Sequence, residues 1–376
     1  MAEKVKHHFV PKFYLKLFVG SDRISLYHIK EGKYLIDVPA DDQAQKKRLY
    51  GDNAEMEDAF GQLEAEVAPI LKKIIEQRKV PLKSDMKYFS LMNFVILQNG
   101  RTLKAIDQVD EGMEQMIKTS MKHYSELDGI NLDDYKISTK NAFVLSTGHA
   151  IPLAIESYDL EPLLIENDTK NPFVTSDNPC IRYNQFAEHI HWHNDGRGYS
   201  LTGLQIFIPL TEKLTLAFFD KKVYRTSRKG KKKTVVKATE NDVFELNKLQ
   251  YVCADECLYY HSDKSVKKLE QQHSSLDKLR DSFVPSTKEF KGEDGYLIAH
   301  TEPQLKTGMS LSFLEIKSEY VKFDIKGLSI GGLKRDTFDD TYIMSIDKAL
   351  KKFGDKHVTM KLFELLDEKQ KRYGNK

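Results

Sequence analysis

The stretch HHFVPKFYLKLF, residues 7–18, decides how the chain begins to fold. Val10 precedes a proline and is therefore biased towards an extended conformation. Pro11 can then open a helix, because the first helical turn does not use the N–H that proline lacks. In that helix Leu17 follows Phe13 by four residues and lies on the same face. The residues that we expect to anchor the N-terminus in the core are Val10, Phe13, Leu17 and Phe18.

Composition and charge are those of an ordinary globular protein. The chain has 376 residues, 40% of them hydrophobic and 30% charged. Its 58 basic and 56 acidic side chains leave a formal net charge of +2, so nucleic-acid binding would need a local basic patch. The three cysteines form no CxxC pair, and no run approaches the ~20 apolar residues that span a bilayer. The sequence therefore predicts a cytoplasmic protein that makes no membrane contact.

The first half of the chain has the patterns of a hairpin followed by helices. Apolar runs at 24–29 and 34–38 flank a polar turn, which predicts two paired strands. From about 50 to 158 the apolar residues recur every three or four positions, as in amphipathic helices. Ser84 is the expected N-cap of a long helix that continues past Gly100.

The second half changes to strands. Short runs bounded by turn residues predict a mostly antiparallel sheet over about 160–262, with Val235 and Val236 closing a long hairpin. We place a boundary near 262–265, which separates a core domain, residues 1–262, from a small C-terminal α/β extension, residues 265–376, that ends in two helices. The predicted fold class is α+β.

Four dispersed patterns carry a family resemblance. They are His8, Pro11, Tyr14, Leu15 and Phe18 in the opening stretch, Glu57 and Glu64 on a helix, LQNGRT at 97–102, and FVTSDNP at 173–179. In this order they resemble a bacterial family known as domain of unknown function 4238, over roughly residues 6–262. The resemblance also makes Asn247 the matching Asn of the family. It implies no activity, and Leu103 stands where the family leads us to expect proline.

The strand end at 175–178 collects chemically active groups. Thr175, Ser176 and Asn178 supply hydroxyls and an amide, and Asp177 a carboxylate, in one turn before a proline. Strand ends of this kind are common sites of binding and catalysis. The alternative is an Asx-turn, in which Asp177 only bonds its own backbone.

Two further landmark pairs lie on helices. Gln98 and Arg101 share a face, and Arg101 can clamp a phosphate bidentately or form a buried ion pair with Asp177 or Glu64. Glu57 and Glu64 also share a face and could hold a divalent metal with Asp177, or form a solvated stripe. His8 could be a catalytic base or a structural histidine bonded to the backbone.

Two other segments are candidates for binding. HIHWHND places His189, His191 and His193 at alternate positions, with Asp195 next in step. On a strand these side chains would face one way and could chelate zinc, whereas the flanking Gly196 and Gly198 make a loop the alternative. Residues 221–237 carry nine Lys or Arg and no acid, and a hairpin tip with Lys231, Lys232 and Lys233 could lie on nucleic-acid phosphates or be solvated.

These residues leave three functions open. The first is a hydrolase, a nuclease or other phosphodiester-cleaving protein, in which His8, Glu64 and Asp177 are catalytic and Arg101 binds phosphate, with a divalent metal as the potential cofactor. The second is a binding module for a nucleotide or nucleic acid, and the third is a structural protein with a buried polar network. The chain has no P-loop, Rossmann glycine pattern or GxSxG elbow, which excludes the commonest NTPase, dehydrogenase and serine-hydrolase types.

Overall fold

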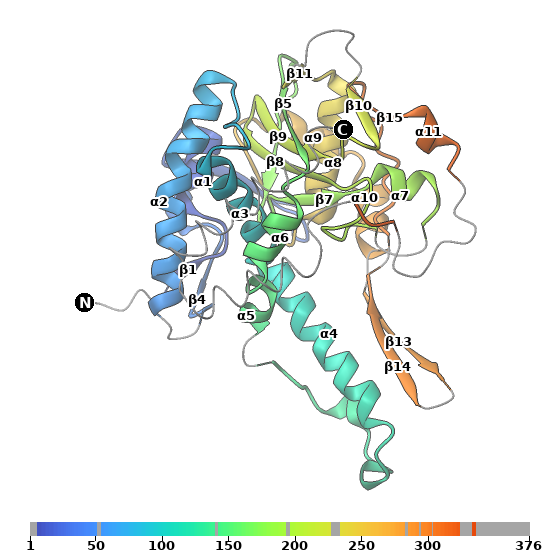
Figure 1. Ribbon diagram of the computed structural model, residues 1–376. Helices are drawn as coiled ribbons and strands as arrows, with labels where there is room; N and C mark the ends of the chain where they lie inside the picture. Colours follow the sequence, from blue (N-terminus) through green and yellow to red (C-terminus); the bar gives the residue numbers. More distant parts are fainter. Residues whose placement is uncertain are drawn as a thin grey trace.

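The structure is a computed structural model that describes residues 6–50, 54–139, 142–192, 196–226, 234–282, 285–292, 295–302, 304–323 and 333–335. A five-stranded sheet in the order β11–β5–β9–β8–β7 lies at its centre (Figure 1). Adjacent strands of this sheet are antiparallel, except β11 and β5, which pair in parallel. Its strands are β5 (Glu161–Glu166), β7 (Ile181–Tyr183), β8 (Gln205–Thr211), β9 (Leu214–Phe219) and β11 (Val235–Lys237).

Helices cover both faces of this sheet, which explains why β8 and β9 are apolar along almost their whole length. On β9, Leu216 and Phe218 belong to one apolar core, whereas Ala217 and Phe219 belong to another, because successive side chains point to opposite faces. The first core contains α1 (Lys12–Val19), α2 (Ala54–Gln77), α3 (Met86–Gly100) and α6 (Ala150–Glu156). The second contains α8 (Glu240–Cys253), α9 (Lys264–Glu270) and α10 (His273–Asp281).

A second sheet has the order β3–β2–β12–β6. Its strands are β2 (Arg23–His28), β3 (Lys33–Pro39), β6 (Thr175–Ser176) and β12 (Cys257–Tyr260). The predicted N-terminal hairpin is therefore present as β2 and β3. The other strands of the described residues form three two-stranded ribbons. These are β1 (Lys6–His8) with β4 (Gln45–Lys47), β10 (Tyr224–Thr226) with β15 (Leu314–Ile316), and β13 (Ser286–Lys291) with β14 (Tyr296–Thr301).

The opening stretch folds largely as predicted. Pro11 precedes α1, and Gly20 ends it in the left-handed conformation at φ 66°. Val10 and Phe18 are fully buried, whereas Phe13 and Leu17 are only partly buried against the same core. The deepest side chains of α1 are Tyr14 and Leu15, so the buried face is turned from the one that we expected.

The long helix predicted from Ser84 is divided in two. Asp85, not Ser84, is the N-cap, and α3 ends at Gly100. Thr102 caps the next helix, α4 (Leu103–Met121), by accepting a hydrogen bond from the backbone N–H of Ala105. Gly100 is required at the break, because a Cβ there would lie 2.3 Å from the carbonyl oxygen of Ser146 in α5 (Ala142–Thr147).

The predicted long hairpin around Val235 is wrong. Strand β10 pairs with β15, and β11 pairs with β5, so the two arms of the basic segment join different sheets. Residues Ser318–Val321 form the short helix α11. The two predicted terminal helices lie outside the described residues.

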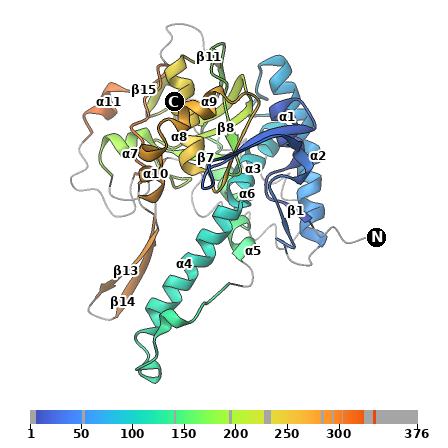
Figure 2. The same cartoon turned by 180° about the vertical axis from the view of Figure 1, so that it is seen from behind.

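Residues beyond 265 pack against the rest of the protein. Leu305, Met309 and Phe313 belong to the same core as α8. Helix α4 and the β13–β14 ribbon extend from the body of the protein in both views (Figures 1 and 2). The α+β prediction is confirmed, whereas the division into two domains stays a prediction. No helix in the described ranges is both long and apolar enough to cross a membrane.

Candidate functional site

The end of α3 binds the N-terminal segment through two of the family residues. The Gln98 Nε2 donates to the carbonyl oxygen of Phe9 at 2.9 Å. The Arg101 guanidinium donates to the carbonyl oxygen of His8 at 2.5 Å and to Glu64 Oε1 at 2.7 Å. Of the two ion pairs that the sequence suggested for Arg101, the structure contains the one with Glu64. These contacts satisfy buried backbone carbonyls and hold the N-terminus in place.

The environment of His8 is partly buried. Its Nε2 makes a 2.9 Å hydrogen bond with the carbonyl oxygen of Asp41. Burial lowers the pKa of the imidazole below its usual value, and the hydrogen bond to Asp41 and the charge of Glu57 oppose that shift. Within the described ranges, no three His, Cys, Asp or Glu side chains gather closely enough to hold a metal ion. Glu57, Glu64 and Asp177 therefore do not form a metal cluster.

Asp177 is buried and fixes the turn that follows α8. Its Oδ1 accepts from the backbone N–H of Asp255 at 2.8 Å, and its Oδ2 from those of Glu256 and Cys257 at 2.7 and 2.8 Å. Burial raises the pKa of this carboxyl to about 6, and the three N–H donors oppose the shift. The carboxylate bonds a turn far away in the sequence, not its own backbone as an Asx-turn would.

The side chains next to Asp177 also form hydrogen bonds to groups that are distant in the sequence. Thr175 shares a hydrogen bond with the Tyr14 hydroxyl at 2.8 Å, and Ser176 donates to Gln250 at 2.7 Å. Asn178 donates to the carbonyl oxygen of Cys253 at 3.0 Å. The structure thus joins His8, Glu64 and Arg101 in one group, and 175–178 with α8 in another. The catalytic roles of His8, Glu64 and Asp177 stay predictions.

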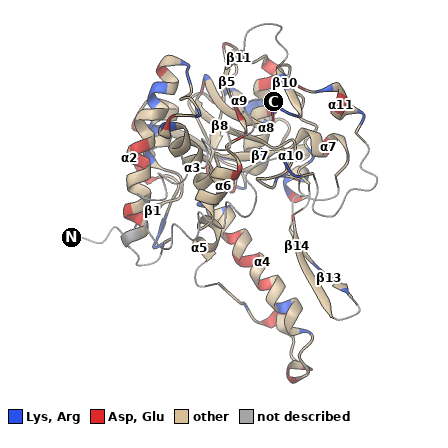
Figure 3. Cartoon of the chain, viewed as in Figure 1, with Lys and Arg blue, Asp and Glu red and all other residues tan. Residues whose placement is uncertain are grey.

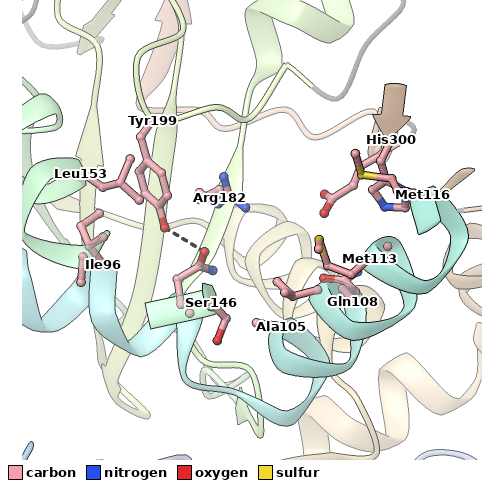
Figure 4. Close-up of a pocket in the computed structure, with 16 residues that line it drawn as sticks. Ile96, Ala105, Gln108, Met113, Met116, Ser146, Leu153, Arg182, Tyr199 and His300 are labelled. Carbon is pink, nitrogen blue, oxygen red and sulfur yellow. Dashed lines mark hydrogen bonds between the residues drawn. The ribbon is translucent and has the colours of Figure 1, made fainter. Parts of the chain in front are cut away.

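The family landmarks also border a cleft. Asn99, Gly100 and Thr102, at the break between α3 and α4, and Asn178, after β6, line two adjoining cavities of about 350 and 60 Å³. Residues common to both cavities are Asn99, Ala105, Gln108, Arg182 and Glu302. Figure 4 shows the larger cavity, with side chains of α4 on one side and Arg182, Tyr199 and Leu153 on the other.

The smaller cavity contains most of the charge. Lys104, Arg182 and Arg197 line it together with a single carboxylate, Glu302. Arg197 pairs with Glu302 at 2.8 Å. Lys104 donates to the carbonyl oxygens of Cys253 and Ala254 at 3.1 and 3.3 Å, and burial lowers the pKa of its ammonium. Basic and acidic residues alternate along the rest of the described chain (Figure 3), so the excess of cations in the smaller cavity is local.

Arg182 is held rigidly, without an ionic partner among the described residues. Its guanidinium carbon lies 4.6 Å from the centroid of the Tyr199 ring, and its Nη1 donates to the carbonyl oxygen of Arg197 at 2.9 Å. The Tyr199 hydroxyl donates to Asn99 Oδ1 at 2.8 Å, and Asn99 Nδ2 donates to the carbonyl oxygen of Cys180 at 2.8 Å (Figure 4). Within the described part of the chain Arg182 has no carboxylate partner, and its buried Nε has no hydrogen-bond partner.

Most residues of this cleft were not predicted from the sequence. Arg182 follows the Thr-Ser-Asp-Asn-Pro element closely, and Lys104 follows Thr102, so proximity to the landmarks could have indicated both. Arg197, His300 and Glu302 come from distant segments and carry no local signal. His300 and Glu302 lie in or next to β14, beyond the residues covered by the family resemblance.

His189 and His191 do not lie on a strand. Helix α7 (Gln185–His189) contains His189, whose Nε2 makes a 3.0 Å hydrogen bond with the carbonyl oxygen of Val321. His191 lies in a turn at φ 52°. The predicted alternation on one strand face is therefore wrong. His193 and Asp195 lie outside the described residues, as do Lys231, Lys232 and Lys233.

The fold and the cleft define an α+β protein with a cationic pocket between a helical layer and a central sheet. The chain belongs to the family described as "Protein of unknown function (DUF4238)", whose profile matches residues 6–264. Comparisons with curated proteins and with solved structures found no match.

Proposed function

We propose that this protein binds a phosphate-bearing ligand, a nucleotide or nucleic acid, in the cleft between α3, α4 and β7. The observation that carries the proposal is the state of Arg182. A half-buried guanidinium that is oriented by Tyr199 and has no carboxylate partner in the described ranges is suited to receive an anion. A planar guanidinium matches two oxygens of a phosphate or carboxylate at once.

Lys104 supports the same proposal. Its ammonium lines the pocket near Arg182 and is bonded only to backbone carbonyls among the described residues. Desolvation penalises that charge, and an anion in the pocket would offset the penalty. With Arg197 paired to Glu302, Arg182 and Lys104 remain as two cations for an incoming ligand, which favours a phosphate over a single carboxylate.

Phosphodiester hydrolysis is the second candidate. His300 and Glu302 line the larger cavity and come from one strand end, so an imidazole and a carboxylate would lie beside a bound phosphate. Such groups can transfer protons in phosphodiester cleavage. A divalent metal would enter with the phosphate, because Mg²⁺ is commonly held by one or two carboxylates together with substrate oxygens. In this candidate function the groups that transfer protons would be His300 and Glu302.

The binding proposal is tested by calorimetric titration of adenosine 5′-monophosphate and inorganic phosphate into the full chain at low salt. We expect Arg182→Gln to weaken the binding of both about tenfold or more, because a charged hydrogen-bond partner is lost. Arg225→Gln is the matched control, since Arg225 is exposed and pairs with Glu315 away from the cleft. Equal affinities in the two variants would contradict the proposal.

The hydrolase candidate has a separate test. A chromogenic phosphodiester is incubated with the protein, with and without Mg²⁺. If His300 transfers a proton, His300→Gln should lower the rate about 100-fold, whereas the exposed His273→Gln should not change it. Phosphate binding without any hydrolysis of the phosphodiester would exclude the hydrolase candidate and support a non-catalytic binding module.

A further inference from the structure

The larger cavity differs in character from the cationic pocket that it joins. Its walls are mainly aliphatic and sulfur-containing side chains from three helices, and it holds about 350 Å³. Those residues are Ile96 from α3, Val109, Met113 and Met116 from α4, and Ala150 and Leu153 from α6. Figure 4 shows Met113 and Met116 directed into this space from α4. We call it the apolar chamber.

Gln108 lies where the chamber meets the cationic pocket, because it lines both cavities. In the described ranges its side-chain amide makes no hydrogen bond, and it is only half-buried. An amide that points into a cavity offers one donor group and one acceptor to a ligand. Asn99 and Tyr199, which also line the larger cavity, are already bonded to each other.

We propose that the ligand of this cleft is a mononucleotide, whose phosphate contacts Arg182 and Lys104 and whose base occupies the apolar chamber. This inference rests on the proposed phosphate binding and names the class of ligand. Thioethers contact aromatic rings favourably, so Met113 and Met116 suit the flat face of a base. Gln108 suits its polar edge, as amide side chains pair with the edges of bases.

The alternatives fit less well. An alkyl phosphate would fill the chamber but would leave the Gln108 amide without a partner. A nucleic-acid strand needs an open groove that follows several phosphates. The chamber volume lies instead near the lower end of the range for small-molecule pockets, about 300–1,000 Å³. The cation count agrees, because two available cations match one phosphate.

The test compares four ligands on the full chain: inorganic phosphate, hexyl phosphate, adenosine 5′-monophosphate and tetrathymidylate. We expect the mononucleotide to bind about tenfold more tightly than inorganic phosphate, from roughly 1.4 kcal/mol of contact with the base. The double variant Met113→Ala, Met116→Ala should lose this advantage and keep its phosphate affinity. Met121→Ala, at the end of α4 and outside the chamber, is the matched control.

Gln108→Leu keeps the side-chain volume and removes the amide. It should therefore weaken the binding of the mononucleotide and leave the binding of hexyl phosphate unchanged. Thermal unfolding of each variant checks that the fold is intact. The mononucleotide inference would be overturned if hexyl phosphate bound as tightly as the mononucleotide, or if tetrathymidylate bound more tightly. Either result would leave the proposed phosphate binding intact. Absence of any phosphate binding that depends on Arg182 would instead overturn the proposed function.

Discussion

The guanidinium of Arg182 lies over the ring of Tyr199, 4.6 Å from its centroid, and the Tyr199 hydroxyl is bonded to Asn99 at the end of α3. Asn99, in the family landmark at 97–102, thus holds Tyr199, and Tyr199 orients the arginine of the central sheet. The stacking fixes the plane of the guanidinium before any ligand arrives, which lowers the entropy lost on binding.

The first prediction follows from this geometry. Arg182→Lys keeps the charge but loses the planar fork and the stacking on Tyr199. We expect phosphate affinity to fall about tenfold, nearly as far as in Arg182→Gln. Calorimetric titration measures both variants under the same conditions. Wild-type affinity in Arg182→Lys would show that only the charge matters.

The second prediction concerns the break between α3 and α4. Gly100→Ala places a Cβ about 2.3 Å from the Ser146 carbonyl oxygen, so α5 must move. We expect a loss of about 2–3 kcal/mol of unfolding free energy, measured by urea denaturation. Gly61 is the matched control, because it lies inside α2 with no atom within 4 Å of an added Cβ.

Gly61→Ala should stabilise the protein by up to about 1 kcal/mol, since alanine favours a helix more than glycine does. A Gly100→Ala variant as stable as Gly61→Ala would mean that the close approach of α5 to α3 is absent in solution.

The third prediction concerns the buried ion pair. Arg101 is 2% exposed, and Arg101→Gln leaves Glu64 without its cation and the carbonyl oxygen of His8 without that donor. We expect the unfolding free energy to fall by about 3–5 kcal/mol, as for other broken buried pairs. Removing the exposed partner in Arg225→Gln should cost at most about 1 kcal/mol. Similar losses in the two variants would argue that Arg101 does not anchor the N-terminus.

The sequence predicted the order of strands and helices well, because that order follows from local periodicity. It did not predict the division of the long helix at Gly100, since the apolar spacing continues through Leu103 and Ile106 and only the close approach of Ser146 requires the break. Of the alternatives for Arg101, the ion pair with Glu64 is present. The Asx-turn suggested for Asp177 is absent, because its carboxylate accepts from the backbone N–H groups of residues 255–257.

The cleft could not be predicted for a different reason. Arg182, Arg197 and Glu302 meet through long-range packing, and Glu302 lies more than a hundred residues after Arg182 in the chain. No local pattern encodes that proximity. The sequence suggested a functional role for the Asp177 carboxylate because its hydrogen-bond donors, the backbone N–H groups of residues 255–257, are distant from it in the chain.

The fourth prediction concerns pH. The pKa of Asp177 is about 6 in the folded protein, above the ordinary 3.8, so the native state binds this proton more tightly than the unfolded state. The resulting stabilisation is complete below about pH 3.8 and is lost as the pH rises through about 6, by roughly 3 kcal/mol. This component should be absent in Asp177→Asn.

Urea denaturation of both proteins between pH 4 and pH 7 measures this component, and the difference between them isolates Asp177. A difference that grows in favour of the wild type as the pH rises would show that the three N–H donors outweigh burial and lower the pKa.

The central claim is that a phosphate group binds beside Arg182. The most direct measurement is a crystal structure grown with adenosine 5′-monothiophosphate, in which anomalous scattering locates the sulfur atom. We expect an anomalous peak within about 4 Å of the Arg182 guanidinium, with the base in the apolar chamber. A peak at another surface, with the cleft empty at saturating ligand, would contradict it.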